Sequence, residues 1–198
     1  MKNVQLLFSG AMADANVKGW KDETRRTRGL DGLNVYPNLW NKKDISINDR
    51  ILTVEFIDVY QSTKRFIKCP YGVPGDVLCQ RETLVYADDM WRYAADRSGF
   101  APGIMPYDWK PAKKVVPNMH MPHWACRFKR TIKEITIERV QDITADGAFA
   151  EGIRCEVLPE DDSDTARAKY VPAYRDLWVK LNGAESWEKN VWVWVVKY

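Results

Sequence analysis

The sequence predicts an α+β fold in which a few strands and scattered short helices form a small barrel. Apolar and polar residues alternate in several runs of strand length, whereas helical spacing appears only over short stretches. The regular strand–helix–strand order of a nucleotide-binding sheet does not appear. The chain has 198 residues, 45% of them hydrophobic and 29% charged, which is a globular composition and the length of one domain with insertions.

The first part of the chain predicts a helix and a hairpin. The Ala-rich stretch of residues 9–18 begins with Ser9, a residue type that caps helices, and Gly19 after it is a typical helix stop. Apolar residues then alternate over residues 45–59 on both sides of Asn48-Asp49, which predicts two strands joined by a turn.

The middle of the chain predicts a strand and a long irregular segment. Turn-forming residues 69–76 lead into residues 77–86, whose apolar and β-branched side chains predict one strand. Residues 87–123 contain many glycines and prolines, so we expect no regular structure there. Loops of that length are uncommon unless they have a role, such as covering a site.

The last third predicts strands on both sides of two helices. Residues 124–140 hold one or two strands, and a short helix follows Thr144, whose hydroxyl is a suitable cap. Helical spacing of apolar residues recurs over residues 172–181, before a stop at Asn182-Gly183. Residues 191–198 are apolar on both faces of a strand, which predicts a strand at the centre of a sheet.

The net charge of +3 is small, but the charges are unevenly distributed. Residues 110–130 contain six Lys or Arg, two His and no Asp or Glu, whereas residues 160–164 read Glu-Asp-Asp-Ser-Asp. A basic stretch beside a cleft, with an acidic exposed loop far from it, would suit a nucleic-acid partner. Two solvated surfaces of opposite charge explain the same pattern.

The cysteines and histidines do not predict a metal site. None of the four cysteines forms a CxxC pair, so we expect reduced, mostly buried thiols. His120, His123 and Cys126 recur at three-residue intervals, but Pro122 lies among them and a fourth ligand is missing. We therefore expect no metal and no cofactor.

No apolar run reaches the roughly 18 residues that a membrane span requires. The apolar run at the N-terminus is too short for a signal peptide. We expect a soluble, cytoplasmic protein with no membrane partner.

The densest polar cluster is Gly19-Trp-Lys21-Asp-Glu-Thr24-Arg25-Arg26, which brings together an amine, a hydroxyl and two guanidinium groups. In a strand, Thr24 and Arg26 would share one face, and a turn before them would place Lys21 alongside. The alternative is a solvated basic turn, because runs of charge usually form solvated faces.

This cluster also carries a family resemblance. Gly19-x-Lys21-x-x-Thr24-x-Arg26 resembles the signature of the ASCH domain, a relative of the PUA domains of RNA-modifying proteins. Pro74-Gly-Asp-Val-Leu-x-x-Arg81-Glu82-Thr resembles the glycine-aspartate turn and strand of that family. Further stretches resemble a longer branch encoded by phages and prophages: His120-Met-Pro-x-Trp124-Ala-x-Arg127, Val140-Gln-Asp-Ile-Thr-x-x-x-Ala-x-x-Glu-Gly152, Leu177-Trp-x-x-Leu-Asn-Gly, Ser186-Trp and Trp192-Val-Trp-Val.

The resemblance implies a PUA-like mixed β-barrel flanked by short helices, with a cleft beside the first helix. The best-understood enzymes of the family remove the acetyl group from N4-acetylcytidine. By resemblance, Lys21 is the base, Thr24 the nucleophile and Glu82 the proton donor, while Arg26 completes the motif. Residues 1–198 would then be one domain with insertions at about residues 29–70 and 87–118. We expect substrate contacts from Trp20, Arg25, Arg26 and Arg127.

The chemistry of these residues is coherent. A threonine hydroxyl is a weak nucleophile that needs an adjacent base. A lysine serves as that base only if burial or cationic neighbours lower its pKa, and Arg25 and Arg26 are such neighbours. A Glu82 carboxyl in a partly apolar strand, with a raised pKa, would donate a proton to the leaving amine. The alternative is that Lys21 and Glu82 form a structural ion pair.

Three functions remain open at this point. The first is metal-independent hydrolysis of a modified nucleobase, nucleoside or RNA, in the bacterial host cytoplasm if a phage encodes the protein. The second is RNA or single-stranded DNA binding without catalysis, through the same cleft and the stretch from Lys110 to Arg130. Its candidate contacts are Lys113, Lys114 and Lys129. The third is a ribonuclease.

The tryptophans divide into core and candidate base-stacking residues. We expect Trp124, Trp178, Trp192 and Trp194 in the core, because they lie in elements whose pattern predicts burial. The remaining candidates lie in or near the signature and the irregular segment, where an indole is able to stack on a base: Trp20, Trp91 and Trp109.

Catalysis also requires a particular geometry. A nucleophile and its base must approach hydrogen-bonding distance, so we expect Lys21, Thr24 and Glu82 to converge. Arg26 should lie on the same wall, where its planar donors orient a carbonyl or phosphate.

Overall fold

The computed structural model describes residues 2–101, 103–156 and 163–198. The chain divides into two compact units, each built from two segments. Unit 1 comprises Met1–Gly19 and Asp76–Thr131, and unit 2 comprises Trp20–Gly75 and Ile132–Tyr198. The expectation of one domain with two insertions stays a prediction.

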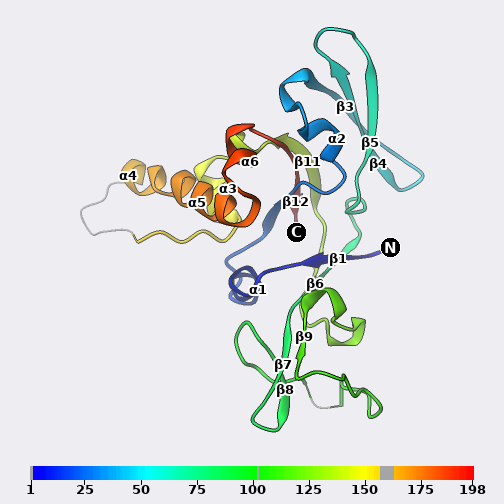
Figure 1. Cartoon of the computed structure of the whole chain (residues 1–198), viewed down its shortest axis with the longest axis vertical. Coiled ribbons are helices and arrows are strands. Elements are labelled where there is room, and N and C mark those ends of the chain that lie inside the picture. Colours follow the sequence, from blue (N-terminus) through cyan, green and yellow to red (C-terminus); the bar gives the residue numbers. More distant parts are fainter. Residues whose placement is uncertain (1, 102, 157–162) are drawn as a thin grey trace. The chain divides into compact units, whose positions relative to one another are not determined.

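Unit 1 contains two three-stranded sheets and a short helix (Figure 1). In the first sheet, β6 lies between β1, which is parallel to it, and the antiparallel β10. In the second, β7 lies between β8 and β9, both antiparallel to it. The elements of this unit are β1 Asn3–Leu7, α1 Gly10–Val17, β6 Val77–Arg81, β7 Leu84–Ala87, β8 Met90–Tyr93, β9 Val115–Val116, η2 Asn118–His120, η3 His123–Ala125 and β10 Lys129–Thr131.

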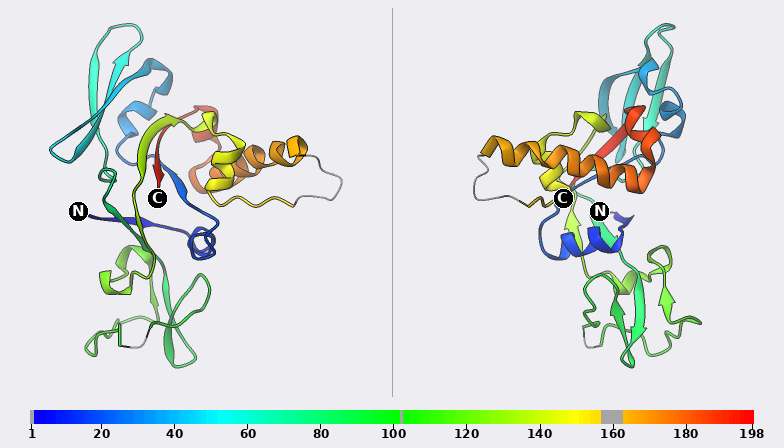
Figure 2. Two further views of the ribbon diagram at one scale, coloured as in Figure 1. Left: turned by 180° about the vertical axis from the view of Figure 1, so that it is seen from behind. Right: turned by 60° about the vertical axis from the view of Figure 1, so that its left-hand side comes forward.

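Unit 2 contains two further antiparallel sheets, with strand orders β11-β12-β2 and β3-β4-β5. Its strands are β2 Glu23–Arg26, β3 Trp40–Asn48, β4 Ile51–Asp58, β5 Lys64–Lys68, β11 Glu134–Arg139 and β12 Trp192–Lys197. Its helices are α2 Asp31–Asn34, η1 Pro37–Leu39, η4 Val140–Asp142, α3 Ala145–Ala150, α4 Ser163–Ala168, α5 Tyr170–Asn182 and α6 Ala184–Glu188. Helices α3 and α5 lie side by side (Figure 2).

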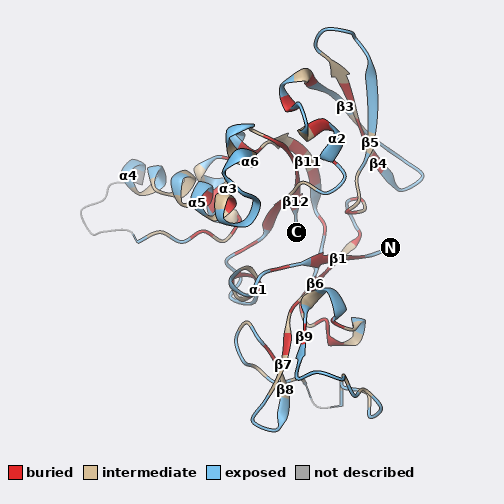
Figure 3. Cartoon of the chain, viewed as in Figure 1, coloured by how far each residue is buried: buried red, intermediate tan, exposed pale blue. Residues whose placement is uncertain are grey.

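The prediction that the last strand is central is confirmed. Strand β12 pairs with β11 on one side and β2 on the other, and all its residues from Trp192 to Val196 are buried (Figure 3). Trp178 on α5 is also buried, so three of the four tryptophans assigned to the core lie there. Trp124 is half-buried.

Several local predictions are also confirmed. Strands β3 and β4 form the expected hairpin, but its turn is Asp49-Arg50, one residue later than the predicted Asn48-Asp49. The two turn residues have φ of 49° and 59°, as a two-residue hairpin turn requires. Thr144 caps α3, because its Oγ1 accepts a hydrogen bond from Gly147 N at 3.1 Å. Helix α1 ends before Gly19, whose φ of 69° favours glycine.

Residues 77–86 form two strands and not the single strand predicted. The break falls at Glu82 and Thr83, between β6 in one sheet and β7 in the next. Glu82 N donates a hydrogen bond to Met121 Sδ, and Thr83 O accepts one from Ala94 N. These contacts outside the strands redirect the chain, and the alternation of residue types does not reveal them.

The α+β class is confirmed, but the described residues contain no closed barrel. Their strands form four separate three-stranded sheets, and each sheet has two edge strands. The order of elements along the chain predicted the class correctly, because class depends on local pattern. Closure depends on pairing between distant strands, which the pattern does not specify.

The expectation of four reduced thiols was wrong. Cys79 on β6 and Cys126 form a disulfide, while Cys69 and Cys155 are free. The two cysteines meet because β10, which follows Cys126, pairs with β6 with Lys129 opposite Cys79. They are 47 residues apart, so no short spacing signals the bond.

Two further expectations concerned an acidic loop and the absence of a membrane span. Of the acidic run at residues 160–164, residues 160–162 lie outside the described residues, and Ser163 and Asp164 begin α4. No helix in the described part of the chain combines the length and apolar character needed to cross a membrane.

Candidate functional site

The candidate site in unit 2 is built around β2. This strand pairs with β12, with Glu23 opposite Lys197 and Arg26 opposite Trp194. Successive side chains of a strand point to opposite faces. Glu23 and Arg25 line a pocket on one face, so Thr24 and Arg26 share the other face, as the sequence predicted. Thr24 is buried and Arg26 half-buried.

Lys21 lies just before β2 and is buried, with its side chain 1% exposed. Its Nζ donates hydrogen bonds to the carboxylate of Glu151 and, at 2.8 Å, to the main-chain oxygen of the same residue. Burial lowers the pKa of Lys21, the carboxylate of Glu151 opposes this shift, and Arg26 and Arg25 add to it. The expected lowering of the Lys21 pKa is thus what the structure gives, with burial as the larger cause.

Arg25 holds three carboxylates together. Its Nε lies 2.7 Å from Glu138 Oε1 and its Nη1 lies 2.5 Å from Glu23 Oε1. Its main-chain N donates to Glu151 Oε1 at 2.5 Å. Burial alone would lower the pKa of Arg25, but the surrounding carboxylates raise it above the usual arginine range. We call Lys21, Glu23, Arg25, Glu138 and Glu151 the β2 cluster.

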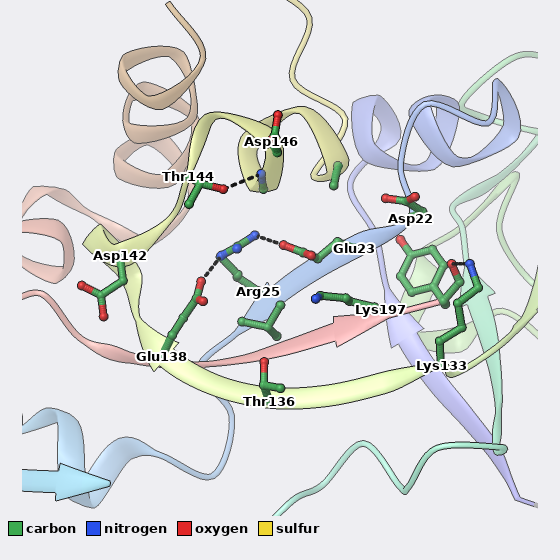
Figure 4. Close-up of a pocket in the computed structure, with 14 residues that line it drawn as sticks. Asp22, Glu23, Arg25, Lys133, Thr136, Glu138, Asp142, Thr144, Asp146 and Lys197 are labelled. Carbon is green, nitrogen blue, oxygen red and sulfur yellow. Dashed lines mark hydrogen bonds and ion pairs between the residues drawn. The ribbon is translucent and has the colours of Figure 1, made fainter. Parts of the chain in front are cut away.

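The pocket on the Glu23 face has a volume of about 410 Å³ (Figure 4). Strands β2, β11 and β12 form its floor and α3 lies along one side, with Arg25 held between Glu23 and Glu138. At the edge of the pocket, Lys133 Nζ donates a hydrogen bond of 3.1 Å to the Tyr198 carbonyl. The lining residues are Asp22, Glu23, Arg25, Lys133, Thr136, Glu138, Asp142, Thr144, Asp146, Gly147, Ala150, Val195, Lys197 and Tyr198.

Trp20, predicted to contact substrate, is 43% exposed at the start of unit 2. Arg154 lies over its ring, with the guanidinium carbon 5.6 Å from the ring centroid. Arg154 Nη2 also donates to the Trp20 carbonyl at 2.9 Å. One face of this indole is therefore already covered by a cation from the same unit.

Glu82 lies in unit 1 and is 1% exposed. Arg127 binds it with two parallel hydrogen bonds, Nε to Oε1 at 2.9 Å and Nη2 to Oε2 at 2.7 Å. The same guanidinium donates to Asp96 at 2.8 Å and Ser98 at 2.5 Å and lies over the ring of Tyr93. We call these five residues the Glu82 cluster. Arg127, predicted to contact substrate, is thus a structural partner of the predicted proton donor.

The structure therefore brings some of the predicted residues together within each unit. Lys21, Thr24, Arg25 and Arg26 lie together in unit 2, and Glu82 and Arg127 lie together in unit 1. The hydrogen bonds of Lys21 Nζ go to Glu151, and those of the Glu82 carboxylate come from Arg127. The catalytic roles of Lys21, Thr24 and Glu82 stay predictions.

Glu151 and Glu138 are the site residues that sequence reasoning missed. Glu151 is buried and binds both Lys21 and Arg25, yet it lies 130 residues from Lys21 along the chain. The only signal was its place in the stretch that resembles the longer branch, Val140-Gln-Asp-Ile-Thr-x-x-x-Ala-x-x-Glu-Gly152.

The six cations of the basic stretch, residues 110–130, fall into two groups. Arg127 belongs to the Glu82 cluster, whereas the other five cations are exposed. These five form no ion pair within the described part of the chain: Lys110, Lys113, Lys114, Lys129 and Arg130. Unit 1 as a whole has eleven Lys or Arg against seven Asp or Glu, so the positive charge of the protein is concentrated there.

The packing of α3 against the β2 cluster can be tested at Gly147. A Cβ added there would lie 2.9 Å from Arg25 Nη2 and 3.2 Å from Ile143 Cγ1. Arg25 is held by its carboxylates and is not free to move. We expect Gly147→Ala to lower the free energy of unfolding by about 1–3 kcal/mol in urea denaturation. Helix propensity alone would predict the opposite, because alanine favours a helix more than glycine does. Gly10→Ala in α1, where the added Cβ meets nothing within 4 Å, is the control and should not destabilise. Equal stability of the two variants would contradict this packing.

Among the described residues, no group of three or more His, Cys, Asp or Glu is placed to hold a metal ion. Comparisons of the chain with protein-family models, with curated proteins and with solved structures found no match.

Proposed function

We propose that the protein is a metal-independent hydrolase of modified nucleosides with a PUA-like, ASCH-type origin, and that its reaction is removal of an acyl group from N4 of cytosine. The observation that carries this proposal is the lowered pKa of the buried Lys21, three residues before a buried threonine. A base for a threonine hydroxyl needs such a shift, because an ordinary lysine is protonated at neutral pH.

The proposed reaction has two steps. Neutral Lys21 takes the proton of the Thr24 hydroxyl, whose oxygen attacks the amide carbonyl carbon of the substrate. The bond from that carbon to N4 breaks, the leaving amine takes up the proton that Lys21 received, and an acyl ester remains on Thr24. Water then hydrolyses the ester, which returns Thr24 and releases the carboxylic acid.

The direct test is release of cytidine from N4-acetylcytidine, followed by chromatography with purified protein. The panel should include longer N4-acyl groups and an acetylated oligonucleotide, because the substrate class is wider than one nucleoside. Absence of turnover across the whole panel would remove the proposal.

A second candidate is binding of single-stranded nucleic acid by unit 1. Its support is the set of exposed cations of residues 110–130 that have no carboxylate partner in the described chain. Such cations are available to phosphates, whose binding releases counterions and makes the affinity strongly salt-dependent. Degradation of labelled RNA that Lys21→Ala abolishes would instead indicate the third possibility, a ribonuclease.

The basic stretch predicts a measurable salt effect. We expect the triple substitution of Lys113, Lys114 and Lys129 by alanine to flatten the slope of log K against log salt by about 2, since each phosphate contact on a single strand contributes roughly 0.7. Fluorescence anisotropy with a labelled oligonucleotide measures the slope. Three exposed lysines of unit 2, Lys43, Lys68 and Lys180, provide the matched control triple. An unchanged slope in the first triple would mean that the basic stretch is merely solvated.

A further inference from the structure

Unit 1 contains a pocket that neither the β2 cluster nor the Glu82 cluster uses. It has a volume of about 400 Å³, which is within the usual range for small-ligand pockets. Its lining residues are Pro106, Asp108, Trp109, Lys110, Pro111 and Trp124. We call it the tryptophan pocket.

Two indoles form a corner of this pocket. The ring centroids of Trp109 and Trp124 are 5.0 Å apart, and the ring planes are inclined at 84°. Two more rings pack against them: the ring centroid of Trp91 lies 4.9 Å from that of Trp109, and the centroid of Phe100 lies 5.4 Å from that of Trp124. Both indoles are half-buried, so each is supported by other rings and still has surface available. This arrangement fixes the orientation of two flat apolar faces.

The backbone that carries Trp124 is also anchored. Tyr93 Oη donates a hydrogen bond of 2.7 Å to the carbonyl of Ala125, the residue after Trp124. The next residue, Cys126, is joined to β6 by its disulfide to Cys79. A binding surface on such a support loses little conformational entropy when a ligand arrives.

The polar groups of the pocket are few and of two kinds. Asp108 is an exposed carboxylate and Lys110 an exposed ammonium, on either side of Trp109 in the chain. Indole faces stack on nucleobases of any sequence. The carboxylate accepts hydrogen bonds from an exocyclic amino group, and the ammonium attracts a phosphate. The carboxylate also repels phosphate, so it suits a base edge better than the backbone.

From this combination we infer that the tryptophan pocket binds one base of a single-stranded nucleic acid and prefers a base with an exocyclic amino group. Trp109 stacks on the base, and Trp124, whose ring plane is inclined at 84° to that of Trp109, contacts the edge of the base. Asp108 accepts from the amino group of the base, and Lys110 contacts a neighbouring phosphate. The inference rests on the second candidate function above, nucleic-acid binding by unit 1. It does not depend on the reaction proposed for Lys21.

Oligocytidine and oligouridine are the appropriate probes, because the two bases have the same size and only cytosine carries an exocyclic amino group. We expect a labelled oligocytidine RNA 12-mer to bind about tenfold more tightly than the oligouridine 12-mer, because one charge-assisted hydrogen bond is worth about that factor. DNA 12-mers with the same bases show whether the protein prefers RNA or single-stranded DNA. Asp108→Asn should bring the ratio of the two affinities close to one, because an amide is both donor and acceptor.

Further variants separate stacking from charge. Trp109→Leu keeps apolar volume but removes the π face, and should weaken binding to both oligonucleotides about 5-fold to 150-fold. Lys110→Gln should lower the salt slope by about 0.7. Tyr107→Ala is the control, because Tyr107 is 97% exposed beside the pocket but does not line it. Asp108 and Lys110 are exposed, so their variants keep the test valid even if Trp109→Leu does not fold.

The outcomes distinguish the possible failures. If the intact protein binds no oligonucleotide, both the inference and the second candidate function are wrong. If it binds, and the Lys113/Lys114/Lys129 triple changes the salt slope while the pocket variants change nothing, only the inference is wrong. If affinity depends on Trp109 but equally for both oligonucleotides, the pocket binds bases and the role of Asp108 is wrong.

Discussion

Arg127→Ala is expected to lower the free energy of unfolding of unit 1 by about 3–5 kcal/mol. The substitution leaves the carboxylate of Glu82, which is 1% exposed, without the two hydrogen bonds that Arg127 donates to it. A buried charge that loses its partner costs far more than a surface pair gains. The loss of the guanidinium over the Tyr93 ring adds to the effect. Urea denaturation followed by circular dichroism measures the change.

Two matched variants show where this energy resides. Asp96 is the other carboxylate partner of Arg127, and its side chain is 23% exposed. Asp96→Asn should therefore lower the free energy of unfolding by less than about 1 kcal/mol. The double substitution Glu82→Met with Arg127→Ala should recover much of the loss, because no buried charge remains. If Arg127→Ala costs no more than Asp96→Asn, the Glu82 cluster is not the buried ion pair described above.

Lys21→Met is expected to reduce kcat/KM on N4-acetylcytidine by about 10²–10⁴-fold, the usual contribution of a general base. Methionine keeps the apolar stem and removes the amine. Arg25 N still donates to Glu151 after the substitution, so that carboxylate keeps a partner and the fold should persist. Thr24→Val, which removes a hydroxyl at constant shape, should abolish turnover, whereas Thr24→Ser should retain part of it. Lys43→Met on the exposed β3 is the control lysine. Normal turnover in Lys21→Met would show that Lys21 is only structural.

The same residue sets the expected pH dependence. A lysine acts as a base in its neutral form, and burial lowers the pKa of Lys21. We therefore expect kcat/KM to rise with pH until the lowered Lys21 pKa is passed and then to level off. Glu151→Gln removes the carboxylate that opposes this shift, so the rising limb should move to lower pH. A profile that does not move in Glu151→Gln would assign the limb to another group.

The features that the sequence predicts correctly are those set by residues close together along the chain. The hairpin of residues 45–59, the cap at Thr144 and the apolar residues of β12 are local patterns, and all three predictions are confirmed, although the turn lies one residue later than predicted. The shared face of Thr24 and Arg26 follows from the period of a strand in the same way. These features need no knowledge of a distant residue.

The features that sequence reasoning missed connect distant segments. Lys21 pairs with Glu151 in unit 2, and Glu82 pairs with Arg127 in unit 1, because chain topology decides which buried charges meet. The sequence shows each charged residue but not its neighbours. For the same reason the Cys79–Cys126 bond and the failure of the sheets to close were not predicted.

The discontinuous construction of both units has a consequence for the synthesis of the chain. Strand β1 in the first segment of unit 1 pairs with β6, which is made only after residues 20–75. Pairing of β2 comes later still in synthesis, because its partner β12 lies at residues 192–197. On the ribosome, therefore, neither sheet can be completed from the residues first made, and pairing of such separated strands is slow because loop-closure entropy is lost before the contacts form. Until β12 emerges, the charged strand Glu23–Arg26 has no β-ladder partner, and this interval is where we expect a nascent chain to need protection by chaperones.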